Sequence, residues 1–270
     1  MAGTGAALIL AAAAATGQVS SGNAFMITAI NQDTGMSDSW MLSSSFLTNG
    51  TTPGGVGVES FDDFDMSAGL PGYSTFTLGG VQYEGIALTD GNGDIIAGLT
   101  DLSVSFEENP VINLDFTVVG GLSNTLVDVT SGELTFGAIS GGIGEASAAV
   151  TVTDNFNPFA GGRDGASFTP NSGAGYLANI NGLAPSGVNF ASLLTTADSI
   201  GSTGPSTFGQ SDAFGFAPLG ASATSASSRF QFTLSAFDTA ATTSTFNIVP
   251  TPASAALLGV AGLAAARRRR

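Results

Sequence analysis

Apolar and polar residues alternate along most of the chain between its two ends. In residues 102–106, Leu, Val and Phe alternate with serines, and in residues 112–118, Ile, Leu, Phe and Val alternate with Asn, Asp and Thr. A period of two residues is typical of a strand with one buried face and one exposed face. The alternation recurs at residues 134–136, 150–152, 230–234 and 246–248. The pattern therefore predicts a series of short strands.

Glycine-rich turn signals separate these strands, for example at residues 79–80, 120–121 and 141–142. Such turns connect neighbouring antiparallel strands. Helical periodicity is rare between them, so we predict an all-β fold, an antiparallel β-sandwich of the jelly-roll kind, over residues 25–247. The 19 Phe residues suit a core formed where two sheets face each other.

Two stretches of this body depart from the pattern. Residues 188–200 have the best helical spacing and are predicted to form one short helix. Residues 155–225 alternate less and are richer in Gly, Pro, Ser and Asn. We interpret them as long loops and short strands of the same domain, with a separate small subdomain as the alternative.

Composition excludes several kinds of chemistry. The chain has no Cys and no His, so it offers no disulfide, no Cys/His zinc site and no His-assisted nucleophile. Its 21 acidic residues face six basic ones, all Arg, and four of these are Arg267, Arg268, Arg269 and Arg270. Residues 1–266 thus carry two arginines against 21 acids, a formal charge of −19. Such a surface repels phosphate backbones, so we expect no nucleic-acid partner.

The N-terminal segment predicts an export signal. Ala6–Ala15 is a ten-residue apolar run, long enough for a signal peptide and too short to cross a bilayer. Small residues that a signal peptidase accepts occur at 13–15 and again at 22–24, and we predict a signal peptide over residues 1–24. No basic residue precedes Arg163, so the usual positive start is missing. The alternative is an Ala-rich helix that packs on the body.

The C-terminal segment has three parts in a fixed order. Val249-Pro250-Thr251-Pro252 comes first, an uncharged stretch from Ala253 to Ala266 follows, and the four arginines end the chain. Fourteen helical residues extend about 21 Å, less than the ~30 Å hydrocarbon core of a bilayer. A short apolar helix ended by arginines is typical of a weak anchor with its end in the cytoplasm. The two prolines separate this helix from the body.

This order resembles the PEP-CTERM sorting signal of exported bacterial proteins, over residues 248–270. Val249, Pro250 and Pro252 match the motif, whereas Thr251 stands where its commonest form has Glu. The resemblance implies recognition by an exosortase, a membrane cysteine transpeptidase-like enzyme, and delivery to the cell surface or to the extracellular polysaccharide matrix. The alternatives are a tail-anchored protein with an arginine stop signal and an unstructured tail.

One segment has oxygen ligands at the spacing of a Ca²⁺ loop. Asp90, Asn92 and Asp94 alternate with glycines, and Asp101 falls where the twelfth loop position would be. The sixth position is Ile95 instead of glycine, and the flanking residues predict two strands. Because Asp-Gly and Asn-Gly are strong hairpin signals, a hairpin turn is the favoured interpretation and Ca²⁺ the second.

Two further groups of side chains suggest sugar chemistry. Paired carboxylates for glycoside hydrolysis, or for Ca²⁺ binding, would come from a cluster around residue 62, and sugar-stacking rings from scattered aromatics. The acids are Glu59, Asp62, Asp63 and Asp65, and the aromatics are Trp40, Tyr73, Tyr83 and Tyr176. A solvated acidic turn and ordinary core aromatics are the favoured interpretations.

Together these features predict a non-enzymatic, exported structural protein of the cell surface or extracellular matrix. Its expected partners are the export machinery, an exosortase, the membrane before processing, and exopolysaccharide. A carbohydrate-binding jelly-roll module, stabilised by Ca²⁺, is the first alternative. A polysaccharide-active enzyme is the second.

Overall fold

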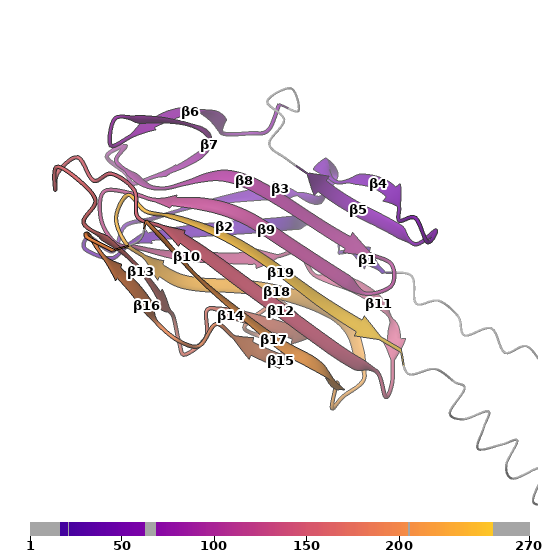
Figure 1. The fold of residues 1–270 in the computed structure, drawn as a ribbon. Helices are drawn as coiled ribbons and strands as arrows, with labels where there is room; N and C mark the ends of the chain where they lie inside the picture. Colours follow the sequence, from indigo (N-terminus) through magenta and orange to yellow (C-terminus); the bar gives the residue numbers. More distant parts are fainter. Residues whose placement is uncertain (1–16, 21, 63–68, 205, 251–270) are drawn as a thin grey trace, which may run out of the picture.

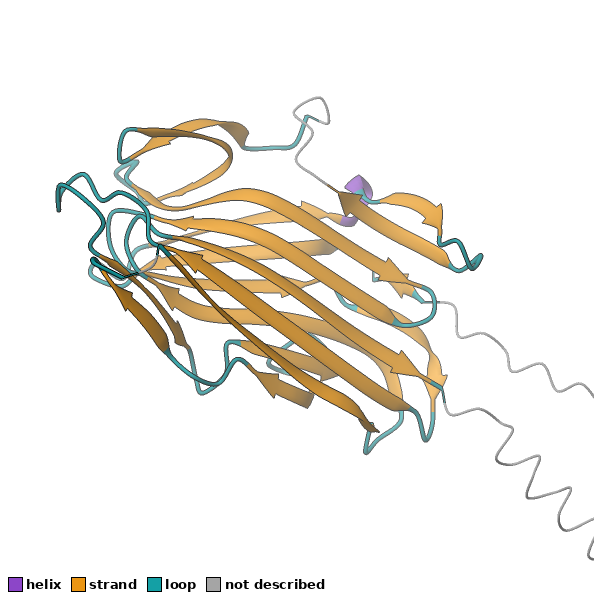
Figure 2. Cartoon of the chain, in the orientation of Figure 1, coloured by secondary structure: helices purple, strands orange, loops and turns teal. Residues whose placement is uncertain are grey.

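Two antiparallel β-sheets packed face to face make up the described part of the protein (Figure 1). The computed structural model describes residues 17–20, 22–62, 69–204 and 206–250. Within these ranges the only helical segment is a single 3₁₀ turn, Ser44–Phe46 (Figure 2). The all-β, two-sheet prediction is confirmed for these residues, whereas the predicted C-terminal helix lies outside them.

The first sheet has ten strands, and its longest strand, β18, pairs with four others. Strand β18 pairs with β10 along one side, and along the other with β11, β14 and β13. The path through the sheet is β1-β11-β18-β10-β2-β3. The bounds are β1 Gln18–Val19, β2 Asn23–Asn31, β3 Ser37–Ser43, β10 Thr125–Ser131, β11 Leu134–Ile139, β13 Gly165–Pro170, β14 Tyr176–Ile180, β15 Val188–Leu193, β16 Asp198–Gly201 and β18 Ala223–Leu234.

The second sheet has nine strands in the path β17-β12-β19-β9-β8-β5-β4, and the β6–β7 hairpin joins it through β8. Its last strand in sequence, β19, is interior, between β12 and β9. The bounds are β4 Thr48–Thr51, β5 Gly57–Asp62, β6 Tyr73–Leu78, β7 Val81–Thr89, β8 Ile95–Glu107, β9 Val111–Gly120, β12 Ile143–Thr153, β17 Thr207–Pro218 and β19 Thr239–Val249.

The apolar side chains of both sheets pack against each other in one core. In β9, Ile112, Leu114, Phe116 and Val118 are all buried, as their alternation predicts. The Phe116 ring lies edge-on to two rings of the opposite sheet, with centroid separations of 6.2 Å to Phe25 and 5.4 Å to Phe230. These edge-to-face contacts between strands of different sheets confirm a sandwich.

The helix predicted over residues 188–200 is wrong. Residues 188–193 form β15, which pairs with β14 so that Ala191 lies opposite Ala178 and Leu193 opposite Tyr176. All four of these side chains are buried. Pairing with β14 outweighs the weak helical pattern, because the free energy gained from burial and interstrand hydrogen bonds exceeds the small free-energy preference for a helix. Residues 155–225 contribute strands to both sheets and are not a separate layer.

Strands also extend past both predicted limits of the body. Strand β1 and the first residues of β2 precede residue 25, and β19 runs to Val249. The backbone N–H of Gly17 donates to the Glu108 carbonyl at 3.1 Å, and that of Ile248 donates to the Pro110 carbonyl at 2.8 Å. Both ends of the body are thus hydrogen-bonded to the β8–β9 turn and lie at the same end of the sandwich.

Candidate functional site

The outer face of the nine-stranded sheet carries short polar side chains in register. Ser105, Asn113, Thr245 and Ser147 lie side by side across β8, β9, β19 and β12. The Asn113 amide donates to Ser105 Oγ at 3.0 Å and accepts from Thr245 Oγ1 at 2.9 Å. Because successive residues of a strand point to opposite faces, the apolar neighbours of these residues are in the core. The alternation that builds the core therefore also builds a flat polar surface.

A shallow hollow of about 360 Å³ lies on this surface over β12, β17 and β19. Its outward-facing walls are hydroxyl and small side chains of β12, β17 and β19. Asp212 in the edge strand β17 also borders the hollow, but it lies opposite the buried Ala148, so its carboxylate projects to the other side of the sheet. Hydroxyl and amide groups on a flat sheet can hydrogen-bond a neutral, hydroxyl-rich polymer along its length. The lining residues are Ser147, Ala148, Ala149, Ser211, Asp212, Ala213, Thr243, Ser244 and Thr245.

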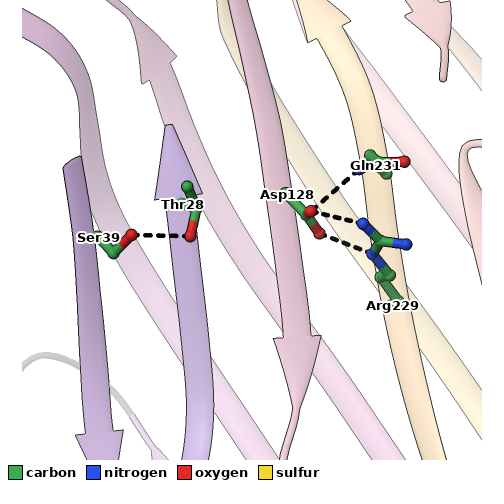
Figure 3. Close-up of polar contacts among 5 residues, drawn as sticks. All are labelled: Thr28, Ser39, Asp128, Arg229 and Gln231. Carbon is green, nitrogen blue, oxygen red and sulfur yellow. Dashed lines mark hydrogen bonds and ion pairs between the residues drawn. The ribbon is translucent and has the colours of Figure 1, made fainter. Parts of the chain in front are cut away.

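The outer face of the ten-stranded sheet is fixed by an ion pair (Figure 3). Arg229 in β18 holds Asp128 in β10 with two hydrogen bonds, Nε to Oδ1 at 2.8 Å and Nη2 to Oδ2 at 2.6 Å. Gln231 Nε2 donates to the same Oδ2 at 3.0 Å. Farther along the sheet, the Thr28 and Ser39 hydroxyls are 2.9 Å apart. This cluster satisfies its own charges, so it is a structural contact between strands.

The predicted Ca²⁺ residues are only partly brought together. Asp90, Asn92 and Asp94 share the β7–β8 hairpin turn, in which Asp90 Oδ1 accepts the backbone N–H groups of Asn92 and Asp94 at 2.8 and 2.9 Å. These bonds lower the pKa of Asp90, the bond from Asp94 most. Asp101 lies on the outer face of β8, seven residues beyond Asp94, which is about 23 Å at ~3.3 Å per residue. Within the described residues, no three Asp or Glu side chains are arranged around one metal position.

The other predicted acids do not form a pair. Glu59 and Asp62 are three positions apart on β5, so their side chains leave opposite faces of the strand. Glu59 Oε2 accepts the Val19 backbone N–H at 3.1 Å. Asp63 and Asp65 lie outside the described residues.

The four candidate aromatics are anchored to the body. Tyr176 is fully buried with its hydroxyl 2.9 Å from Ser228 Oγ, and burial raises its pKa to about 12. Trp40 Nε1 donates to the Pro71 carbonyl at 2.8 Å. Tyr83 stacks on Phe76 with ring centroids 5.6 Å apart, and Tyr73 is half-buried against the core. None of the four lies on the polar face described above.

Sequence reasoning missed a buried acidic pair, Asp154 and Asp238. Asp154 directly follows β12 and is 2% exposed, and Asp238 directly precedes β19 and is 0% exposed. The two are 84 positions apart, so no local motif joins them. Only the register of β12 on β19, with Thr153 opposite Thr239, brings them together.

The predicted sorting motif begins where the body ends. Val249 is the last residue of β19, where it lies opposite Ile143, and Pro250 follows, exposed. Thr251, Pro252 and Arg267–Arg270 lie outside the described residues. Among the described residues, no helix has the length and apolar character needed to span a membrane.

Comparison with known proteins gives no family assignment. No family model and no curated protein matches the chain. Its sandwich is similar to part of the arabinose-bound MgGH51 α-L-arabinofuranosidase, with 16% identity over 70% of this chain and 25% of that one, and a TM-score of 0.27. It is also similar to the VP2 subviral particle of infectious bursal disease virus, with 8% identity, 87% and 71% coverage, and a TM-score of 0.26. The chain spans about a quarter of the arabinofuranosidase. At these TM-scores neither likeness carries an argument about function.

Proposed function

We propose that this chain is an exported structural protein of the cell surface or extracellular matrix, sorted and processed through its C-terminal segment. An N-terminal leader would start export, and the Ala253–Ala266 helix would hold the chain in the inner membrane. Arg267–Arg270 would fix its orientation, and an exosortase would act near Val249–Pro252. The acidic sandwich would then be attached at the surface or released into the matrix.

The order of the tail carries this proposal: Val-Pro-Thr-Pro, an uncharged stretch and terminal arginines. The end of β19 supports it, because a cut on the C-terminal side of Pro250 removes no strand residue. Val249 keeps its place opposite Ile143, and the sandwich stays whole.

The N-terminal strands favour one of the two leader cleavage positions. Cleavage after Ala24 would remove β1 and the first residues of β2, including the fully buried Ala24, whose carbonyl accepts the Gly132 N–H at 2.6 Å. Cleavage after Ala15 would leave all of these strands in place. We therefore expect the mature chain to start close to residue 16.

Mass spectrometry of the native protein, recovered from envelope and extracellular fractions of its host, tests the proposal. We expect a start near residue 16, an end near residues 250–252, and no peptide from Ala253–Arg270. An intact tail on protein found in the cytoplasm or inner membrane would contradict sorting. A Pro250→Ala and Pro252→Ala double variant is expected to keep its tail, whereas a Pro218→Ala control, in β17, is expected to be processed normally.

The polar face of the nine-stranded sheet favours a second function, binding of neutral polysaccharide. Its in-register hydroxyl and amide groups, with the hollow beside them, match a hydroxyl-rich ligand. Purified protein applied to glycan arrays, with and without chelator, tests this. An Asn113→Ala and Thr245→Ala double variant should lose binding that a Thr28→Ala and Ser39→Ala variant of the opposite face retains. Equal binding by both variants would rule out this face.

A further inference from the structure

The ends of β12 and β19 bring two buried carboxyl groups together. The pairing of these strands ends at Thr153 opposite Thr239, and the same register continued by one residue would place Asp154 opposite Asp238. The charge of Asp154 acts on the Asp238 carboxyl group, so the two lie close together. Opposed residues in an antiparallel pair have Cβ atoms about 5 Å apart and project to the same side of the sheet. The Asp238 carboxylate also reaches across the strands, since its Oδ1 accepts the backbone N–H of Asn155 at 3.0 Å. The two side chains therefore share one environment.

The two carboxyl groups are not equally satisfied. Asp238 accepts hydrogen bonds from the Asn155 N–H and the Ser235 hydroxyl. Asp154 is 2% exposed, and neither of its carboxylate oxygens has a hydrogen-bond partner among the described residues. A buried carboxylate without a partner costs several kcal/mol, so native structures rarely contain one unless an ion or water fills the gap.

The neighbouring acids make the negative charge of the two buried carboxylates more costly. The pKa of Asp238 is raised to about 6, mainly by burial, with a smaller contribution from the charges of Asp154 and Asp164, whereas the hydrogen bonds from Ser235 and Asn155 act to lower it. Asp164 adds another acid at this end of the sheet, where its Oδ2 accepts from the Asn157 amide at 2.8 Å. Of the two arginines in the described ranges, Arg229 is paired with Asp128, and Arg163 is exposed and forms no ion pair with a described residue. The described chain thus supplies no positive charge to the pair.

We propose that a divalent cation, Ca²⁺, binds between Asp154 and Asp238 and supplies the missing charge. Ca²⁺ prefers oxygen ligands and tolerates irregular coordination, accepting carboxylates together with carbonyl, amide and water oxygens. Two carboxylates are present, and the Ser235 hydroxyl is already bonded to one of them. Mg²⁺ demands a stricter octahedral geometry and keeps more of its water, so it is expected to bind more weakly here.

This site is separate from the Asp90 turn. One carboxylate oxygen of Asp90 already accepts hydrogen bonds from two backbone N–H groups of its own turn, whereas neither oxygen of Asp154 has a hydrogen-bond partner among the described residues. The Asp154–Asp238 pair also lies far from the tail junction. Thr239 and Val249 are ten residues apart on β19, about 34 Å at ~3.4 Å per residue. The cation would hold together the end of the sandwich that is distant from the proposed membrane anchor.

The test measures Ca²⁺ binding and thermal stability of the full-length protein after removal of metal with EDTA. Calorimetric titration is expected to show one Ca²⁺ site above any weak surface binding. Ca²⁺ at a hundredfold excess over its dissociation constant is expected to raise Tm by about 5–10 °C for a protein of this size. Mg²⁺ at equal ionic strength should raise Tm less, which separates site binding from screening of the acidic surface.

Variants locate the site. Asp154→Asn keeps the side-chain shape and should abolish the Ca²⁺-dependent rise in Tm, and Asp238→Asn should do the same independently. Two matched controls, Asp212→Asn at the exposed edge strand and Asp90→Asn in the hairpin turn, should keep the full rise. If Asp90→Asn abolishes the rise and Asp154→Asn keeps it, Ca²⁺ binds at the turn and the proposal is wrong. It is also wrong if the wild-type protein binds no Ca²⁺ and shows no shift beyond that of Mg²⁺.

Discussion

Asp128 lies in a strand and Asp154 directly after one in the same sandwich, yet their carboxylates have opposite surroundings. Asp128 lies between β10 and β18, where Arg229 and Gln231 donate three hydrogen bonds to it. Asp154 lies at the end of β12, more deeply buried, and receives none among the described residues. Asp90 shows a third solution, in which backbone N–H groups of a turn satisfy the carboxylate.

The comparison shows which buried carboxylates of an acidic protein need a positive charge that the chain itself does not supply. With 21 acids and six arginines, four of them in the tail, the body lacks the cations to pair its buried carboxylates. The Asp128–Arg229 ion pair uses one of the two that remain. A buried acid elsewhere must keep a proton or take up a cation from solution. At the Asp154–Asp238 pair, protonation or cation binding is expected to change the free energy of unfolding.

The largest expected effect is a pH dependence of stability from Asp238 in Ca²⁺-free buffer. Its folded pKa of about 6 is above its unfolded value of 3.8, so folding favours the protonated form. The stabilisation is present below pH 4 and is lost as pH rises through 6, a loss on the order of 3 kcal/mol. Urea unfolding of wild type and Asp238→Asn between pH 4 and 7 measures it as a difference, which cancels the other acids. Parallel profiles for the two proteins would contradict the raised pKa.

The second expected effect comes from breaking the satisfied cluster. In Arg229→Met, Asp128 loses its ion pair but keeps Gln231, and the side chains of Arg229 and Asp128 are only 13% and 24% exposed. We expect a loss of about 2 kcal/mol, below the 3–5 kcal/mol of a fully buried pair. Adding Asp128→Asn should recover part of this loss, because no unpaired charge is then left. Chemical denaturation of the single and double variants measures both effects, and additive losses would show that the two residues do not interact.

The smallest expected effect is at the hairpin turn. Asp90→Ala removes the acceptor for two backbone N–H groups, but the turn is exposed and water replaces the carboxylate. Tm is expected to stay within about 2 °C of wild type, as for most surface substitutions. Differential scanning calorimetry measures it. A much larger drop would mean that the turn organises the β7–β8 hairpin more strongly than its exposure indicates.

Alternation of apolar and polar residues was enough to predict the fold class. Ile112 to Val118 read as a half-buried strand and form one, because each apolar side chain gains burial only on one face. The helical spacing at residues 188–200 predicted the wrong element, because strand β14 offers backbone partners that a local pattern does not reveal. The hairpin at Asp90 was predicted from its Asp-Gly and Asn-Gly pairs, since turn chemistry is local.

The acidic pair could not be predicted from the sequence. Asp154 sits in an Asn-rich stretch that is typical of a loop, and Asp238 follows a Phe with no metal-like spacing around it. Their meeting depends on the register between β12 and β19, and both are buried only in the folded sandwich. Register over long sequence separation is a property of the whole fold, and composition reveals only that counter-charges are scarce.

In this account, the buried Asp154 carboxylate needs a bound cation. The most direct test measures the unfolding free energy of wild type and of Asp154→Asn, first in EDTA and then in saturating Ca²⁺. Without metal, Asp154→Asn is expected to be the more stable protein by about 1–3 kcal/mol, because it no longer buries an unpartnered carboxylate. With Ca²⁺ the order should reverse, because only wild type gains the bound ion. If wild type is the more stable protein in EDTA and Ca²⁺ changes neither value, the chain satisfies Asp154 by itself and the account is contradicted.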